Sequence, residues 1–139
     1  MTKTKITALL LVVIAILSFA ACGKTEPGDL WADAIYTEDT ALGTGACEFS
    51  LTVTAEDKSI TLTVLSDEEY LGDALLALGV IEGTEGAYGL YIDKVNGILA
   101  SWEADNAWWG VYVDGATATT GIDGIKIENG AQYELKYTK

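Results

Sequence analysis

Residues 90–119, LYIDKVNGILASWEADNAWWGVYVDGATAT, decide the fold, because two strand-turn-strand patterns follow one another within them. Apolar runs flank Asn96-Gly97 in the first pattern and Asp114-Gly115 in the second. Asn-Gly and Asp-Gly suit the tight two-residue turns of β-hairpins, in which both turn residues take positive φ. The stretch therefore predicts two antiparallel hairpins, with strands over 90–95 and 98–102 and then over 108–113 and 116–119.

The strand pattern continues on both sides of this stretch. Residues 47–54 and 59–65 alternate apolar and polar side chains around a short polar turn. A last hairpin is expected to join 125–127 to 132–137. Such alternation is typical of half-buried strands. A further short strand is expected near 34–37, in an arm that packs on the domain.

One helix is predicted, over about residues 67–78. Ser66 followed three residues later by Glu69 is a capping-box pattern, apolar residues then recur at helical spacing from Leu71 to Leu78, and Gly79 ends the pattern. One helix among many hairpins predicts an α+β domain of mostly antiparallel β-strands.

The N-terminus has the layout of a signal peptide. Lys3 and Lys5 precede an apolar run over 6–19, and Ala20-Ala21-Cys22 follows, which resembles a lipobox. We expect Cys22 to carry a diacylglycerol, which supplies two chains and so a stable anchor on the extracytoplasmic face of the cell membrane. The expected domains are a lipoprotein signal peptide (1–21), a tether (22–29) and one domain (30–139).

The composition excludes several chemistries. The 139 residues include 21 Asp and Glu, 8 Lys, no Arg and no His, for a formal net charge of −13. A surface this acidic repels nucleic acid. Without His there is no Ser-His-Asp or Cys-His machinery and no His-ligated zinc, so the chain is not expected to be an enzyme. The aspartates fall in separate turns without calcium-ligand spacing, so no metal site is expected: Asp93, Asp105, Asp114 and Asp123.

Cys47 has no intrachain partner if Cys22 is lipidated. Strand alternation places it on the same face as Phe49, Leu51 and Val53. We expect a buried, inert thiol.

The candidate binding site lies in residues 108–113. Alternation puts Trp109 on a core face with Val111 and Val113, and puts Trp108, Gly110 and Tyr112 on the other face. Because glycine lacks a side chain, a slot between two aromatic rings could receive a flat ligand. The alternative is that the two rings pack on the arm or on a neighbouring loop. The predicted ligand-binding residues are Trp108, Tyr112, Gly110 and Trp109, with Tyr91, Tyr88, Asn96 and Gly97 of the neighbouring hairpin as the other wall.

Several segments together resemble the transcobalamin-like C-terminal domain family, bacterial members of which were catalogued as a domain of unknown function. Their order and spacing carry the resemblance over nearly the whole mature chain: residues 30–34, 71–75, 88–92, 95–98, 107–109, 112–115, 121–123, 128–130 and 133–137. The resemblance implies a small β domain with one helix. In the animal cobalamin carriers such a domain closes over one face of the corrinoid, and a large helical domain holds the other.

Two functions follow as hypotheses. The first is a membrane-tethered binding lipoprotein for a corrinoid such as cobalamin, or for a similar flat ligand, which acts as a monomer, requires no cofactor and feeds an uptake transporter. The second is a surface protein-interaction or adhesion module that binds no small ligand. No helical partner domain is expected within these 139 residues, so we expect them to bury less of a ligand than a two-domain carrier does.

Overall fold

The computed structural model describes residues 29–139. The chain splits into two units, residues 1–32 and residues 33–139. The predicted signal peptide, Cys22 and the tether up to residue 28 lie outside the described residues. In the first unit, the Trp31 N–H donates to Asp29 Oδ1 at 3.0 Å, where the 3-10 helix η1 (Leu30–Asp33) begins. No helix within residues 29–139 is long and apolar enough to cross a membrane.

The longest hairpin is formed by β2 (Cys47–Ala55) and β3 (Lys58–Ser66), as predicted. Its turn contains Glu56 at φ 58°. Every second side chain of both strands is buried, in the alternating pattern of a sheet with one covered face: Phe49, Leu51, Val53, Ile60, Leu62 and Val64. Cys47 shares that face but is only half-buried, because it opens the strand, so the prediction of a buried thiol is wrong.

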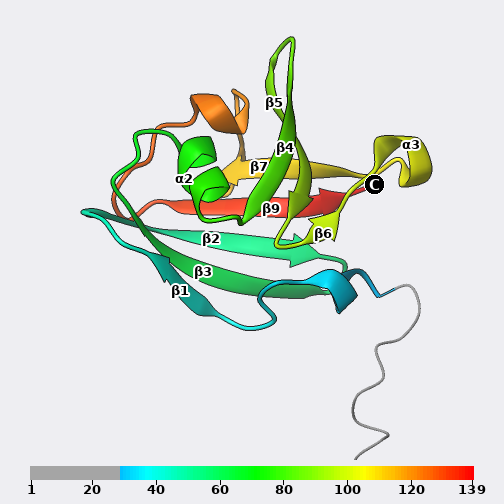
Figure 1. Cartoon of the computed structure of the whole chain (residues 1–139), viewed down its shortest axis with the longest axis horizontal. Helices are drawn as coiled ribbons and strands as arrows, with labels where there is room; N and C mark the ends of the chain where they lie inside the picture. Colours follow the sequence, from blue (N-terminus) through cyan, green and yellow to red (C-terminus); the bar gives the residue numbers. More distant parts are fainter. Residues whose placement is uncertain (1–28) are drawn as a thin grey trace, which may run out of the picture. The chain divides into compact units, whose positions relative to one another are not determined.

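Four more strands join this hairpin in a six-stranded sheet of order β1-β3-β2-β9-β7-β8 (Figure 1). They are β1 (Thr40–Gly43), β7 (Trp108–Val113), β8 (Ala116–Thr117) and β9 (Gln132–Thr138). The β7–β8 hairpin is confirmed. However, β1 runs parallel to β3 and β9 runs parallel to β2. The sheet is therefore mixed, and the prediction of mostly antiparallel strands is partly wrong. Turn residues report only on pairs adjacent in the chain, and both parallel pairs join distant segments.

The segment over 34–37 is not a strand. The Ile35 N–H donates to the backbone oxygen of Asn96 at 3.0 Å, and the Tyr36 N–H donates to Asn96 Oδ1 at 2.8 Å. These backbone groups are therefore satisfied by one turn residue instead of by a strand ladder. Residues 125–127 are also not a strand, because Lys126 makes only an isolated bridge to Tyr70.

A second, three-stranded antiparallel sheet contains β4 (Ile81–Gly86), β5 (Gly89–Val95) and β6 (Ile98–Leu99). The predicted turn at Asn96-Gly97 joins β5 to β6, although β6 ends three residues early. The pattern did not predict β4, because only Ile81 of its side chains is buried and glycines interrupt the alternation. The β4–β5 hairpin projects away from the six-stranded sheet (Figure 1).

The predicted helix is present but shorter, as α2 (Leu71–Ala77). Its N-cap is Tyr70, which makes no side-chain capping bond, so the capping-box prediction is wrong. Ser66 instead ends β3, and its Oγ accepts from the Glu68 N–H at 3.0 Å. Three short helical turns were not predicted: η1, α3 (Trp102–Asp105) and the 3-10 helix η2 (Ile122–Gly124).

The core of the second unit lies where α2, η2 and the small sheet cover one face of the large sheet. Phe49 and Tyr133 meet edge to face within it, with ring centroids 5.4 Å apart. The Tyr133 hydroxyl donates to the Lys126 oxygen at 3.2 Å and accepts from the Glu128 N–H at 3.1 Å. This buried phenol therefore holds the turn before β9 against the sheet.

Burial raises the pKa of Tyr133 above its ordinary value of 10.0, and the nearby Glu128 and Asp114 carboxylates add to the effect. Above about pH 10 the unfolded chain releases this proton more readily than the folded chain does. The stabilisation is thus complete below pH 10 and is lost as the pH rises further. We expect the free energy of unfolding, measured by urea titration, to fall above about pH 10.

Tyr133→Phe provides the control for this alkaline loss. It should lower the free energy of unfolding at pH 7 by about 1–2 kcal/mol, because two hydrogen bonds disappear. The free energy of unfolding of this variant should also fall less steeply above pH 10 than that of the parent chain. Parallel declines would show that the lysines or other tyrosines cause the loss.

Candidate functional site

The candidate site is built on β5, α3 and the start of β7. Tyr91 and Asp93 both lie on β5, and Thr84 on β4 pairs with Tyr91 and donates its hydroxyl to Asp93, so the two side chains lie on the same face of the small sheet. Ile92 between them is buried. The Ala100 N–H donates to the backbone oxygen of Asp93 at 3.0 Å, which fixes the chain leaving β6 against β5.

The single turn of α3 presents two further side chains. Ser101 is its N-cap, and the Ser101 Oγ accepts from the Ala104 N–H at 3.2 Å. Asn106 ends the turn in the left-handed conformation, at φ 54°, and its N–H donates to the Trp102 oxygen at 3.0 Å. These caps hold Trp102 and Glu103 in place on a turn too short to be stable by itself.

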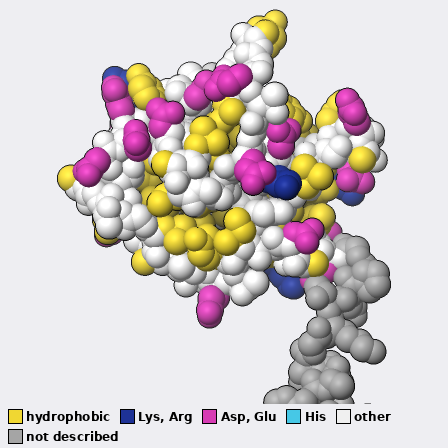
Figure 2. Space-filling view, in the orientation of Figure 1, with side chains coloured by type: hydrophobic (Ala, Val, Ile, Leu, Met, Phe, Trp, Pro, Cys, Tyr) yellow, Lys and Arg dark blue, Asp and Glu magenta, His cyan; other side chains and the backbone are white. Residues whose placement is uncertain are grey.

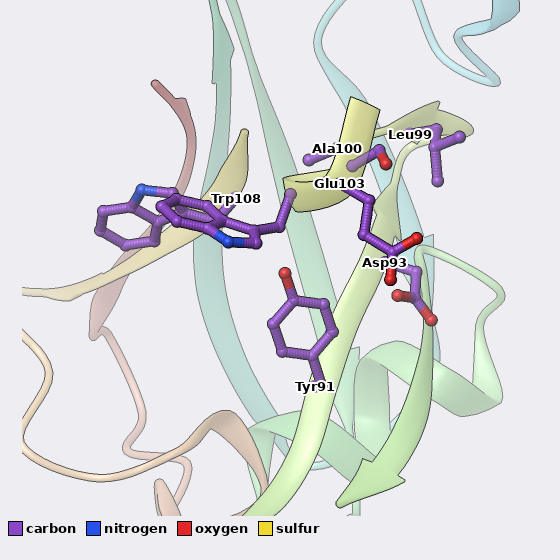
Figure 3. Close-up of a pocket in the computed structure, with 8 residues that line it drawn as sticks. Tyr91, Asp93, Leu99, Ala100, Glu103 and Trp108 are labelled. Carbon is purple, nitrogen blue, oxygen red and sulfur yellow. The ribbon is translucent and has the colours of Figure 1, made fainter. Parts of the chain in front are cut away.

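A cavity of about 820 Å³ opens between these elements, and we call it the Trp102–Trp108 groove. Its volume falls within the usual range for small-molecule sites. Figure 3 shows the ring of Tyr91 pointing toward Trp108, and shows the carboxylates of Asp93 and Glu103 on the same side of the groove. The lining residues are Tyr91, Asp93, Leu99, Ala100, Ser101, Trp102, Glu103 and Trp108.

The groove concentrates exposed apolar surface. Its lining includes four of the seven large hydrophobic side chains that are exposed among the described residues: Trp102 (59% exposed), Leu99 (53%), Tyr91 (48%) and Trp108 (42%). Scattered exposed hydrophobics are ordinary, whereas a cluster around a hollow marks an interaction site. The groove is therefore the best candidate for a binding site on the described part of the chain.

The charged groups of the lining are all carboxylates. Asp93 is half-buried, and its Oδ2 accepts from the Thr84 hydroxyl at 2.9 Å, while Glu103 is exposed. No lysine lines the groove. Figure 2 shows carboxylates spread over the visible face, with few lysines among them.

The space over Gly110, where the sequence predicted a slot, is bordered by three side chains. A Cβ built on Gly110 would lie 3.2 Å from a ring carbon of Tyr112, 3.3 Å from the Thr138 hydroxyl and 3.4 Å from a ring carbon of Trp108. Side chains of Trp108, Tyr112 and Thr138 therefore border the space over the bare backbone. A slot between the rings of Trp108 and Tyr112 stays a prediction. Tyr112 does not line the groove.

The other predicted site residues are dispersed. Trp109 is buried at 5% exposed and packs edge to face on Tyr137, with centroids 5.6 Å apart. Asn96 is fully buried and holds the 35–36 segment. Gly97 has φ 79°, and a Cβ there would clash with the Asp33 backbone oxygen, so it belongs to the turn. Tyr88 is fully exposed at the tip of the β4–β5 hairpin. The structure thus brings only Tyr91 and Trp108 of the predicted set into the groove.

The sequence pattern did not single out six of the eight lining residues as binding residues: Asp93, Leu99, Ala100, Ser101, Trp102 and Glu103. A signal for Trp102 was present, because Ser101 and Asn106 are residue types that cap a helical turn. The predicted strand over 98–102 hid that signal.

The described residues hold no group of three or more Asp, Glu, Cys or His side chains that could bind a metal ion. The Asp123 carboxylate instead accepts from the Leu90 N–H at 3.3 Å, and Asp114 Oδ1 accepts from the Gln132 N–H at 2.9 Å. These two carboxylates fix loops to strands.

Comparisons with known proteins give a fold and a family. A protein from Ruminococcus gnavus ATCC 29149, described as metal binding, shares 25% sequence identity with this chain at a TM-score of 0.64, over 68% of this chain and 98% of that one. Haptocorrin, crystallised in complex with Cbi, shares 20% identity at a TM-score of 0.51, over 67% of this chain. This chain spans only 25% of haptocorrin, and that likeness shows the fold alone.

The search of curated proteins found no match. A family model described as a domain of unknown function, DUF4430, matches residues 69–139. This matched region contains β4–β9 and every residue of the groove.

Proposed function

This chain belongs to the DUF4430 family, and on that premise we propose that it is a lipid-anchored, extracytoplasmic binding module whose Trp102–Trp108 groove takes a corrinoid or a similar flat ligand. It is a binding protein and not an enzyme in this proposal. The observation that carries it is the gathering of Tyr91, Leu99, Trp102 and Trp108, all exposed, around one open cavity. When a ligand of matching shape covers large apolar side chains that were exposed to water, the burial of their surface contributes favourable binding free energy.

The choice of ligand class rests on two supports. A flat ring presents a face to indole and phenol side chains, and three such side chains line the groove. The fold is shared with haptocorrin, which was crystallised with Cbi (cobinamide). Because this chain corresponds to a quarter of haptocorrin, we expect it to cover one face of the ligand and to bind more weakly than a two-domain carrier.

A metal ion is not the proposed ligand. The Ruminococcus gnavus protein is described as metal binding, but the described residues of this chain offer no set of three side chains that could hold one. The two carboxylates of the groove are accompanied by aromatic rings, which are poor ligands for hard cations.

The membrane anchor is proposed from the sequence of the first 22 residues. Two lysines, an apolar run and Ala20-Ala21-Cys22 form the pattern that directs export and lipidation. An anchor of two acyl chains would hold the groove near the outer surface of the membrane. That position suits a protein that captures a ligand and delivers it to an uptake transporter.

One experiment tests binding and anchoring together. The full chain is produced in a bacterial host, the cells are separated into membrane and soluble fractions, and labelled cobinamide retained by each fraction is counted. We expect retention in the membrane fraction above that of host cells without the chain. Trp108→Ala should remain in the membrane fraction and lose about tenfold or more in affinity, because a large apolar contact disappears.

Two further variants separate the outcomes. Cys22→Ser should move the binding activity out of the membrane fraction without changing the affinity. Tyr88→Ala, at an exposed aromatic that does not line the groove, should bind like the parent. Equal retention by the parent and by Trp108→Ala would reject the groove as the binding site, and membrane retention of Cys22→Ser would reject the anchor.

A further inference from the structure

We infer that the Trp102–Trp108 groove selects for positively charged planar ligands and against anionic ones of the same shape. The inference rests on the proposed function, because it names the charge class of the ligand at that same groove. It goes further than the shape of the groove, since an apolar cavity alone would accept both charges.

The carboxylates of the lining provide the first argument. Asp93 and Glu103 come from different elements, β5 and α3, and lie on the same side of the groove (Figure 3). The Thr84 hydroxyl donates to Oδ2 of Asp93, which leaves Oδ1 able to accept from a ligand. An anionic ligand would bring like charges together here, whereas a cation or an N–H donor would pair with them.

The lack of a counter-charge in the lining provides the second argument. Lys94 follows Asp93 on β5, and the bulge at Asp93 places it on the same face of the small sheet as Tyr91, but Lys94 does not line the groove. Its Nζ lies 3.6 Å from the carboxylate of Glu82 on β4. Since Lys94 is paired with Glu82 and no lysine lines the groove, the charged side chains that a bound ligand meets in the lining are both carboxylates.

The aromatic side chains provide the third argument. Tyr91, Trp102 and Trp108 line the same cavity as the carboxylates. The faces of such rings are electron-rich and attract cations, indole most strongly. Aromatic faces and carboxylates therefore favour the same sign of charge on a ligand, and a flat cation can use both at once.

Two porphyrins of similar size and opposite charge test the inference on the full chain, with Trp fluorescence quenching as the measurement. One carries N-methylpyridinium groups and is cationic, and the other carries sulfonatophenyl groups and is anionic. We expect the cationic porphyrin to bind at least about tenfold more tightly at physiological salt. The double variant Asp93→Asn with Glu103→Gln should reduce the ratio of the two porphyrin affinities, cationic to anionic, about fivefold.

The acidity of the whole chain could also attract a cation, so a charge-matched control is needed. Glu38→Gln with Glu68→Gln removes the same number of carboxylates from exposed positions outside the groove. This control should leave the ratio nearly unchanged. If it lowers the ratio as much as the groove variant does, general attraction explains the preference and the inference is overturned.

The remaining outcomes distinguish the inference from the proposed function. If neither porphyrin binds in a way that depends on Trp108, tested with Trp108→Ala, the groove is not a site for flat ligands and both proposals fail. If both porphyrins bind equally through Trp108, the proposed function stands and the charge selectivity is wrong. Circular dichroism of each variant confirms that the comparison is made between folded chains.

Discussion

Trp109→Ala is expected to lower the free energy of unfolding by about 3–5 kcal/mol, which is a large part of the stability of a small domain. The side chain is only 5% exposed and packs edge to face against Tyr137, its cross-strand partner on β9. Truncation would leave a cavity that the paired strands cannot close. Urea or thermal unfolding followed by circular dichroism measures the loss.

The neighbouring tryptophan is the matched control, because Trp108 lies on the same strand but is 42% exposed in the groove. Trp108→Ala should cost less than about 1 kcal/mol of stability while it weakens ligand binding. Trp109→Phe should be milder than Trp109→Ala, because phenylalanine keeps an aromatic ring in the core and leaves a smaller cavity. Both variants remove the indole N–H, which is buried without an acceptor among the described residues. Equal stability losses at 108 and 109 would contradict the assignment of one residue to the core and the other to the groove.

The contrast between these tryptophans shows how far the sequence alone could lead. Strand alternation predicted that Trp109 would face the core and that Trp108 would face away from it, and the exposures confirm this. The hairpins at Asn96-Gly97 and Asp114-Gly115 were also predictable, because turn geometry is encoded in two adjacent residues. All of this information is local.

The non-local features could not be predicted in the same way. The parallel pairing of β9 with β2 depends on which strand edge remains available after the hairpins form, and no residue pattern records it. β4 escaped prediction because a strand exposed on both faces lacks the alternation that marks burial.

The groove itself illustrates the same limit. Alternation fixes the face from which Trp108 leaves its strand, but it does not fix the rotamer that brings its ring into the groove. The other walls come from β5 and from α3, a single turn whose caps are visible only when a strand is not assumed there. A site assembled from three separate segments therefore required the structure.

Asn96→Ala is the second substitution with a large expected effect, and we expect it to lower the free energy of unfolding by about 2–4 kcal/mol. The side chain is fully buried. Its Oδ1 accepts from the backbone N–H of Tyr36, and its Nδ2 donates to the backbone oxygen of Tyr36, both at 2.8 Å. Alanine would leave both backbone groups without that partner, and it would also have to adopt the φ of 53° that asparagine tolerates.

Asn96→Gly separates the two causes, because glycine accepts the positive φ but cannot make the side-chain bonds. Its stability should therefore fall between that of the parent and that of Asn96→Ala, and the difference between the two variants measures the backbone strain. Ligand affinity, measured well below the unfolding transition, should change little in either variant, since Asn96 does not line the groove. If Asn96→Ala instead weakens binding and leaves the unfolding curve in place, Asn96 acts on the ligand as the sequence first suggested, and its bonds to Tyr36 contribute little to the fold.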